Sequence, residues 1–156
     1  MYNKVLVPLD GSKLAEAILG HVTAITAGCQ AAEVVLLLVV ERAEHGATST
    51  WGGVVSAKRM AEVEQKAKAE ARDYLAKMVG KLKREGMAVK TSILQGNPAD
   101  NILDYAQENQ VDLIVMSTHG RSGIKRWAFG SVADRVARHS PVPVLLVSPS
   151  GFRAGR

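Results

Sequence analysis

Residues 113–132, LIVMSTHGRSGIKRWAFGSV, form the stretch around which the rest of the chain is organised. The stretch starts as an apolar run of β-type residues and continues into a loop of small and basic residues with Gly120, Gly123 and Gly130. A helix is expected to begin at Ser131. In an open α/β sheet, ligands lie beyond the carboxyl ends of the strands, and such a loop offers backbone N–H groups and a helix N-terminus to an anion. The stretch is therefore a candidate phosphate-binding loop.

Apolar runs alternate with amphipathic segments along the rest of the chain. The run 33–40, EVVLLLVV, is apolar without alternation, which is typical of a strand covered on both faces. Residues 57–85 carry apolar side chains at spacings of three and four, from Met60 and Val63 to Met78 and Leu82, which predicts a long amphipathic helix. The expected strands are residues 5–9, 33–40, 88–94, 111–117 and 142–147, and the expected helices are residues 12–27, 57–85, 98–109 and 131–139.

This alternation predicts an α/β fold, with an open, doubly wound, five-stranded and mostly parallel sheet that carries helices on both faces. We expect the strand order 3-2-1-4-5, with the more alternating strand 88–94 near an edge. The ligand crevice should open where residues 8–10, 39–41 and 116 onward end their strands. Residues 1–148 are expected to form one domain, and residues 149–156 a flexible tail.

Composition limits the classes of function. The formal charge of +5 favours anionic ligands, but the basic residues are scattered, so no nucleic-acid partner is expected. Cys29 is the only cysteine, which excludes an intramolecular disulfide and a cysteine-based zinc site. No signal-peptide pattern opens the chain, and the longest apolar run, 34–40, is too short to cross a bilayer. We expect a cytoplasmic protein without a membrane partner.

Three motifs together resemble the universal stress protein family: VLVPLDGS near the amino end, NPADNILDYAQENQVDLIVMSTHGRSG in the second half, and GSVADRVARHSPVPVLLV near the carboxyl end. The resemblance covers nearly the whole chain and implies a Rossmann-like fold. Nucleotide-binding members of the family carry the signature Gly-x2-Gly-x9-Gly-(Ser/Thr). Gly120, nine intervening residues, Gly130 and Ser131 match it, whereas Ser117 occupies the position of the first glycine.

Carried over to this chain, the resemblance implies a set of nucleotide-binding residues. Pro8, Leu9 and Asp10 would flank the adenosine, with the Asp10 carboxylate near the adenine or ribose, and Val39 would line the adenine slot. The residues that would approach the ribose and phosphates are Met116, Ser117, His119, Gly120, Arg121, Gly130, Ser131 and Val132. Glycines allow a close backbone approach and successive N–H groups form an anion nest, so no Walker-type lysine is needed.

The resemblance also implies what the site holds and does. The ligand would be ATP, or ADP or AMP, and Mg²⁺ could accompany the phosphates. The protein would act as a regulatory or stress-response module with an unidentified signalling partner and at most slow ATP hydrolysis, and no residue is assigned as catalytic or as a metal ligand. A homodimer is expected through the last strand, from Val142 to Val147.

Other interpretations of these residues stay open. Asp10 could be a turn residue that accepts local backbone hydrogen bonds, and His119 could be a solvent-facing loop residue. Because Ser117 stands in place of the motif glycine, the chain could instead be a family member that has lost nucleotide binding and acts as a dimeric partner-binding module. A phospho-acceptor receiver centred on Asp10 is a third alternative, although receivers need an acidic cluster at the first strand and a lysine after the last one. The long segment 41–56 is expected to be functional or disordered, and its Trp51 is expected to make a packing or dimer contact or to belong to a mobile lid.

Overall fold

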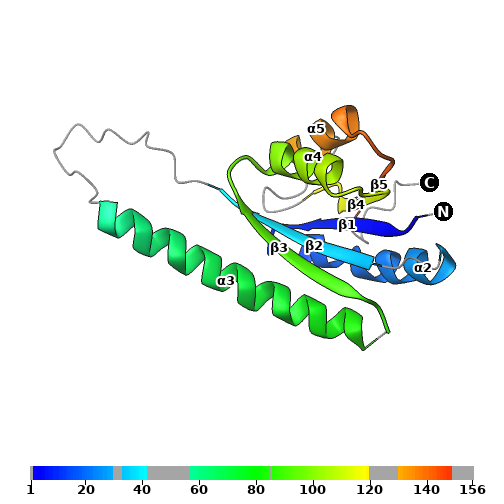
Figure 1. The fold of residues 1–156 in the computed structure, drawn as a ribbon, viewed down its shortest axis with the longest axis horizontal. Helices are drawn as coiled ribbons and strands as arrows, with labels where there is room; N and C mark the ends of the chain where they lie inside the picture. The colour runs from blue at the N-terminus through cyan, green and yellow to red at the C-terminus, as the bar shows by residue number, and fades with distance from the viewer. Residues whose placement is uncertain (1, 30–32, 42–56, 85, 120–129, 149–156) are drawn as a thin grey trace, which may run out of the picture.

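A computed structural model describes residues 2–29, 33–41, 57–84, 86–119 and 130–148. It contains one sheet of five strands in the order β3-β2-β1-β4-β5, and every pairing is parallel (Figure 1). The predicted class and strand order are confirmed, and β3 lies at an edge as expected. The strands are β1 (Lys4–Leu9), β2 (Glu33–Val40), β3 (Val89–Gln95), β4 (Leu113–Ser117) and β5 (Val144–Val147).

Helices cover both faces of this sheet. In Figure 1, α2 and α3 lie on one side of the strands and α4 and α5 on the other. Across the described ranges, no helix is long and apolar enough to span a membrane. The helices are α1 (Lys13–Glu16), α2 (Leu19–Cys29), α3 (Ala57–Lys83), α4 (Pro98–Glu108) and α5 (Ser131–His139).

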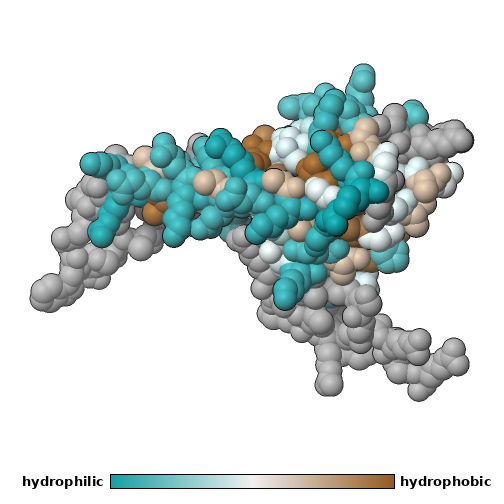
Figure 2. All heavy atoms as spheres, turned by 90° about the horizontal axis from the view of Figure 1, so that it is seen from below, coloured by the Kyte–Doolittle hydropathy of each residue, from teal (hydrophilic) through white to brown (hydrophobic). Residues whose placement is uncertain are grey.

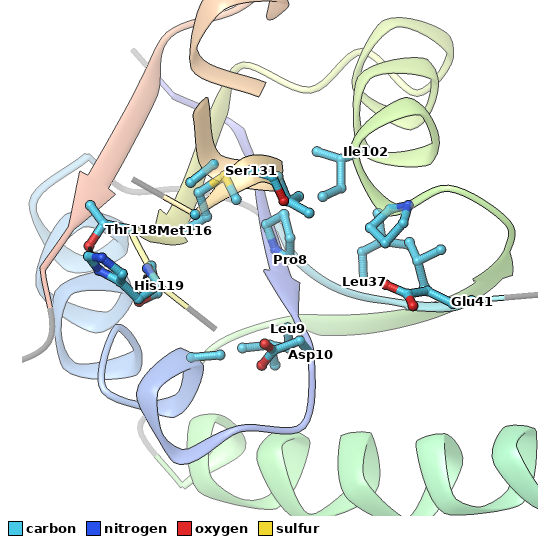
Figure 3. A pocket seen from close by; sticks show the side chains of 17 residues that line it. Pro8, Leu9, Asp10, Leu37, Glu41, Ile102, Met116, Thr118, His119 and Ser131 are labelled. Atoms are coloured by element: carbon cyan, nitrogen blue, oxygen red, sulfur yellow. Dashed lines mark hydrogen bonds between the residues drawn. The ribbon is translucent and has the colours of Figure 1, made fainter. Parts of the chain in front are cut away.

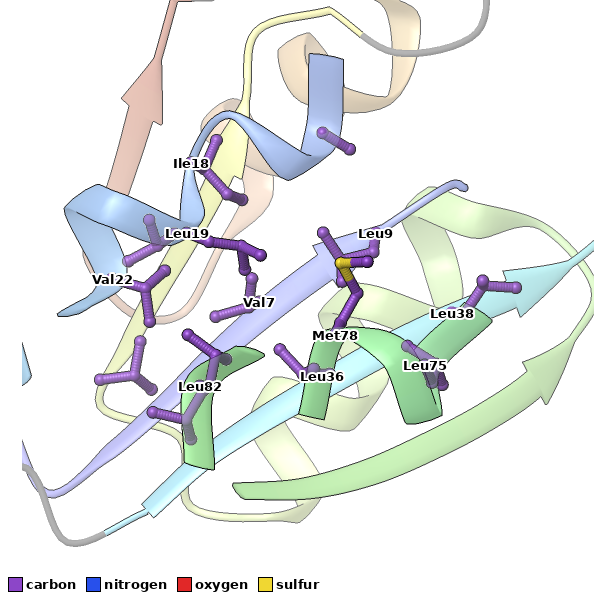
Figure 4. Close-up of a cluster of buried hydrophobic side chains, with 14 of the residues drawn as sticks. Val7, Leu9, Ile18, Leu19, Val22, Leu36, Leu38, Leu75, Met78 and Leu82 are labelled. Atoms are coloured by element: carbon purple, nitrogen blue, oxygen red, sulfur yellow. The ribbon is translucent and has the colours of Figure 1, made fainter. Parts of the chain in front are cut away.

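Two apolar cores follow from the alternation of side chains along each strand. Val5 and Val7 of β1 belong to the core under α1, α2 and α3, where they meet residues such as Leu36 and Leu82 (Figure 4). Leu6, between them in the sequence, belongs instead to the core under α4 and α5. Since β1 is covered on both faces, residues 5–9 form a continuous apolar run.

The prediction of one continuous helix over residues 12–27 is wrong, because the structure has two helices there, α1 and α2. The Ser12 hydroxyl accepts a hydrogen bond from the backbone N–H of Ala15 (3.1 Å) and so caps α1. The chain then leaves the helix after α1 and re-enters one at Leu19. The N–H of Ile18 donates to the Ala15 carbonyl (3.4 Å), a three-residue step that tightens the chain and brings Ile18 into the core. The helix α2 then ends at Cys29, two residues beyond the predicted end.

The long helix α3 confirms its prediction, but its apolar face is not buried along its whole length. Ala71, Met78 and Leu82 are buried, whereas Val63 is 59% exposed. Figure 1 shows why: the N-terminal part of α3 extends beyond the strands. The spacing of apolar residues identifies a shared helix face, but it does not say where the sheet beneath that face ends.

The amino end of β1 is joined to β4 by a side chain. The Asp112 carboxylate, just before β4, accepts hydrogen bonds through Oδ2 from the backbone N–H groups of Asn3 and Lys4, each at 2.8 Å. The ammonium of Lys4 in turn donates to the Asn109 carbonyl (2.9 Å). The two backbone hydrogen bonds hold the pKa of Asp112 below its usual value, because they stabilise the charged carboxylate.

Asp112→Ala is expected to lower the free energy of unfolding at pH 7 by about 1–2 kcal/mol, since two hydrogen bonds to a charged acceptor are lost. The folded pKa of Asp112 lies below the unfolded one, so its contribution is complete above the unfolded value of about 4 and fades as the pH falls through the folded value. Urea unfolding at pH 7 and pH 3 should therefore show a smaller difference between variant and parent at pH 3.

Asp104→Ala is a suitable control, because Asp104 is exposed on α4. Its substitution should change stability little at either pH. A loss for Asp112→Ala of the same size at both pH values would contradict the ionic origin of the effect.

Candidate functional site

A cavity of about 250 Å³ opens at the carboxyl edge of the sheet. This is close to the lower end of the range of about 300–1,000 Å³ that is common for small-molecule pockets. Its walls come from the ends of β1, β2 and β4 and from the first turns of α1, α4 and α5. The lining residues are Pro8, Leu9, Asp10, Ala15, Leu37, Val39, Glu41, Pro98, Ile102, Met116, Ser117, Thr118, His119, Gly130, Ser131, Val132 and Ala133.

The two sides of the cavity differ in chemistry. In Figure 3, Leu37, Ile102 and Glu41 lie on one side, and Thr118 and His119 lie on the other. The first side is mainly apolar and ends at a carboxylate, whereas the second carries hydroxyl, imidazole and backbone groups. An elongated ligand with an apolar ring system and a polar end matches this arrangement.

The polar side is built by the close approach of two segments. The N–H of Thr118 donates to the Val147 carbonyl of β5 (3.0 Å), and the N–H of Gly130 donates to the Thr118 carbonyl (2.8 Å). Gly130 then caps α5 with φ −59° and ψ 150°, dihedrals that any residue adopts. A Cβ at this position would lie 3.4 Å from the Thr118 carbonyl oxygen, at the short end of ordinary contact, so any preference for glycine here comes from space and not from backbone conformation.

Ser117, which replaces the first motif glycine, is accommodated without strain. In the described part of the chain, Gln110 is the only residue other than glycine with a positive φ, so Ser117 has an ordinary backbone conformation. Its hydroxyl accepts a hydrogen bond from the N–H of His119 (3.3 Å). Serine at this position therefore keeps a loop geometry that does not require glycine.

Asp10 combines two of the roles considered for it. Its Oδ1 accepts a hydrogen bond from the N–H of Ser12 (2.9 Å), as a turn residue does, and the same residue lines the cavity.

Nearby on α3, burial raises the pKa of the Tyr74 hydroxyl, and the Glu16 and Asp10 carboxylates add to the effect. Tyr74 is therefore neutral at physiological pH.

The side chains next to Gly130 also form a local pair. Thr118 Oγ1 and His119 Nδ1 lie 2.9 Å apart, within hydrogen-bonding distance. His119 is thereby oriented at the cavity wall and is not simply a solvent-facing loop residue. In the described ranges there is no group of three or more His, Cys, Asp or Glu residues that could hold a metal ion.

Ten of the twelve predicted site residues line the cavity. The other two, Gly120 and Arg121, lie outside the described residues, as do Trp51 and the loop that follows Glu41. The structure adds Ala15, Leu37, Glu41, Pro98, Ile102, Thr118 and Ala133. The edge position of Glu41 was expected, but no role was assigned to it. Pro98 could have been found, because a helix that follows a parallel strand begins at the carboxyl edge.

Comparison with known proteins identifies the family of this chain. The model of the universal stress protein family matches residues 1–148. The chain belongs to the universal stress protein family. The universal stress protein MJ0577 of Methanocaldococcus jannaschii is 33% identical over 155 residues, which cover 94% of this chain and 95% of that protein.

Solved structures of the universal stress protein family share the architecture. The MJ0577 structure superposes with a TM-score of 0.83 at 32% identity and covers 97% of this chain and 99% of its own. UspA of Lactobacillus plantarum gives a TM-score of 0.80 at 28% identity, with coverages of 94% and 97%. A family member from Arabidopsis thaliana with AMP bound gives a TM-score of 0.67 at 19% identity, with coverages of 96% and 93%, a likeness of fold alone.

Proposed function

We propose that this universal stress protein binds an adenine nucleotide, ATP or its products ADP and AMP, in the cavity at the carboxyl edge of the sheet. The observation that carries the proposal is the arrangement of the cavity, with an apolar slot on one side and the N-terminus of α5 on the other. Apolar walls suit a flat base, and a helix N-terminus suits a phosphate. The Arabidopsis protein that shares this fold was solved with AMP bound.

The residues present fit such a ligand. Val39 and Ile102 would pack against the base, and Asp10, at the end of β1, could accept hydrogen bonds from ribose hydroxyls. Gly130, the N-cap of α5, puts no side chain in the way of a phosphate, and Ser131 at the first position of α5 brings a hydroxyl and a backbone N–H. Arg121 is proposed to reach the phosphates, with Mg²⁺ as their companion.

Binding without efficient turnover fits the site better than catalysis. Rapid phosphoryl transfer needs carboxylates that hold the metal, a base that orients the nucleophile and a cation for the transition state. Asp10 and Glu41 are the carboxylates that line the cavity among the described residues, and Asp10 already accepts a turn hydrogen bond. We therefore propose a nucleotide-dependent regulatory module with at most slow hydrolysis.

The proposal includes a second copy of the chain as a partner. β5 is the last strand in the sheet order, and Leu145 on it is exposed. An apolar strand at the end of a sheet favours pairing or cover. A homodimer through β5 would meet that requirement and leave the cavity open at the carboxyl edge.

The test begins with protein purified without added nucleotide. Mass spectrometry of the supernatant after denaturation should identify a stoichiometric adenine nucleotide, and calorimetric titration of the stripped protein should show saturable ATP binding. A nucleotide-free protein that does not bind ATP at millimolar concentration would refute the proposal and favour a partner-binding module. In that case Ser117→Gly would test whether the missing motif glycine is the cause, by creating binding that the parent lacks.

A further inference from the structure

Glu41 is the one acidic side chain on the apolar side of the cavity among the described residues. It follows directly after β2 and lies on the same side as Leu37 and Ile102, away from Thr118 and His119 (Figure 3). The neighbouring wall residues Leu37 and Ile102 offer no hydrogen-bonding side chains. The Glu41 carboxylate is thus placed to accept hydrogen bonds at the rim of a slot that otherwise recognises its ligand by apolar contact.

The distribution of charge orients a nucleotide in this cavity. The described lining includes the carboxylates of Asp10 and Glu41 and neither lysine nor arginine. Phosphates near Glu41 would be repelled, whereas the N-terminus of α5 at Ser131 attracts them. The base therefore faces Glu41. Asp10 lies between Glu41 and His119 in Figure 3, which suits the ribose.

We propose that Glu41 selects the base of the bound nucleotide by accepting a hydrogen bond from an exocyclic amino group, and so favours adenine over 6-oxopurines. An ionised carboxylate only accepts hydrogen bonds. Adenine presents an amino donor at C6, whereas hypoxanthine and guanine present a carbonyl oxygen there, and two facing acceptors leave both groups unpaired at a cost. This role rests on the proposed function of the cavity.

The test compares ATP with ITP, in which a carbonyl oxygen replaces the amino group. We expect the parent to prefer ATP by about tenfold or more. A site that accepts a hydrogen bond from a ligand amino group discriminates against a ligand without that group. Glu41→Gln introduces an amide that both donates and accepts, so the preference should fall to within about threefold, mainly through tighter ITP binding. Glu108→Gln, at the exposed end of α4, is the matched control and should keep the parental ratio.

A second ligand, 2′-deoxy-ATP, distinguishes a role of Glu41 at the base from a role at the ribose. The ratio of ATP to 2′-deoxy-ATP affinities should be the same in the parent and in Glu41→Gln. A change in that ratio with an unchanged ATP to ITP ratio would overturn the proposal and place Glu41 at the ribose. ATP binding with both ratios unchanged would overturn the selectivity role alone, whereas a parent that binds no ATP would overturn the proposed function with it.

Discussion

Gly130→Val is expected to weaken ATP binding at least about a hundredfold, because the helix N-terminus that would receive the phosphates could no longer be approached. A Cβ at Gly130 lies at the limit of contact with the Thr118 carbonyl, and the branched valine adds two methyl groups at the same place. The hydrogen bond from the Gly130 N–H to that carbonyl would be strained as well. Isothermal titration of stripped protein with ATP measures the effect.

Two further variants make this result specific. Gly130→Ala adds a single carbon at 3.4 Å and should reduce affinity by less than about tenfold, since a few tenths of an ångström of adjustment accommodates it. Gly80→Val places the same side chain on α3, where nothing lies within 4 Å of the added Cβ, and should bind ATP like the parent. Unchanged ATP affinity in Gly130→Val, with a parental circular dichroism spectrum, would contradict the assignment of the phosphate end to α5.

Leu36→Ala should produce a large loss of stability, about 2–5 kcal/mol in the free energy of unfolding. Leu36 is 0% exposed and lies in the middle of β2, opposite Val7 of β1 and Thr91 of β3. In Figure 4 its side chain is surrounded by those of Val7 and Leu82, among others. Alanine would remove these contacts and leave a space that a sheet held by strands on both sides cannot close.

Val63→Ala is the matched control for this truncation. Val63 belongs to the same predicted apolar pattern but is 59% exposed on α3, so its truncation should cost less than about 0.5 kcal/mol. Equilibrium urea denaturation of both variants gives the comparison. Equal losses would mean that the N-terminal part of α3 is covered by something beyond the sheet.

The sequence was most informative where burial leaves little choice. Residues 33–40 are apolar throughout because β2 is covered on both faces, and the strand has the predicted bounds. The bounds of α5 were also predicted correctly, from Gly130 and the amphipathic segment that follows it. The break between α1 and α2 could not be predicted, because it depends on hydrogen bonds around Ile18 and no proline marks it.

The site could be predicted as far as it depends on topology. Parallel strands end at one edge, so Asp10, Val39 and Met116 were correctly expected to lie together. Ile102 belongs to the predicted helix 98–109, but it was not among the predicted site residues. Its place in the cavity depends on how α4 returns over the sheet, and periodicity alone does not contain that information.

The central position of β1 determines when this fold can be completed during synthesis. β1 is made first, yet Asn3 at its start bonds to Asp112, 109 positions later, and β4 is one of its two neighbours in the sheet. Until the second half of the chain has left the ribosome, that edge of β1 is unpaired and one face of the β1–β2 pair lacks α4 and α5. The nascent protein thus passes through a stage with an open strand edge, and such an edge is prone to aggregation.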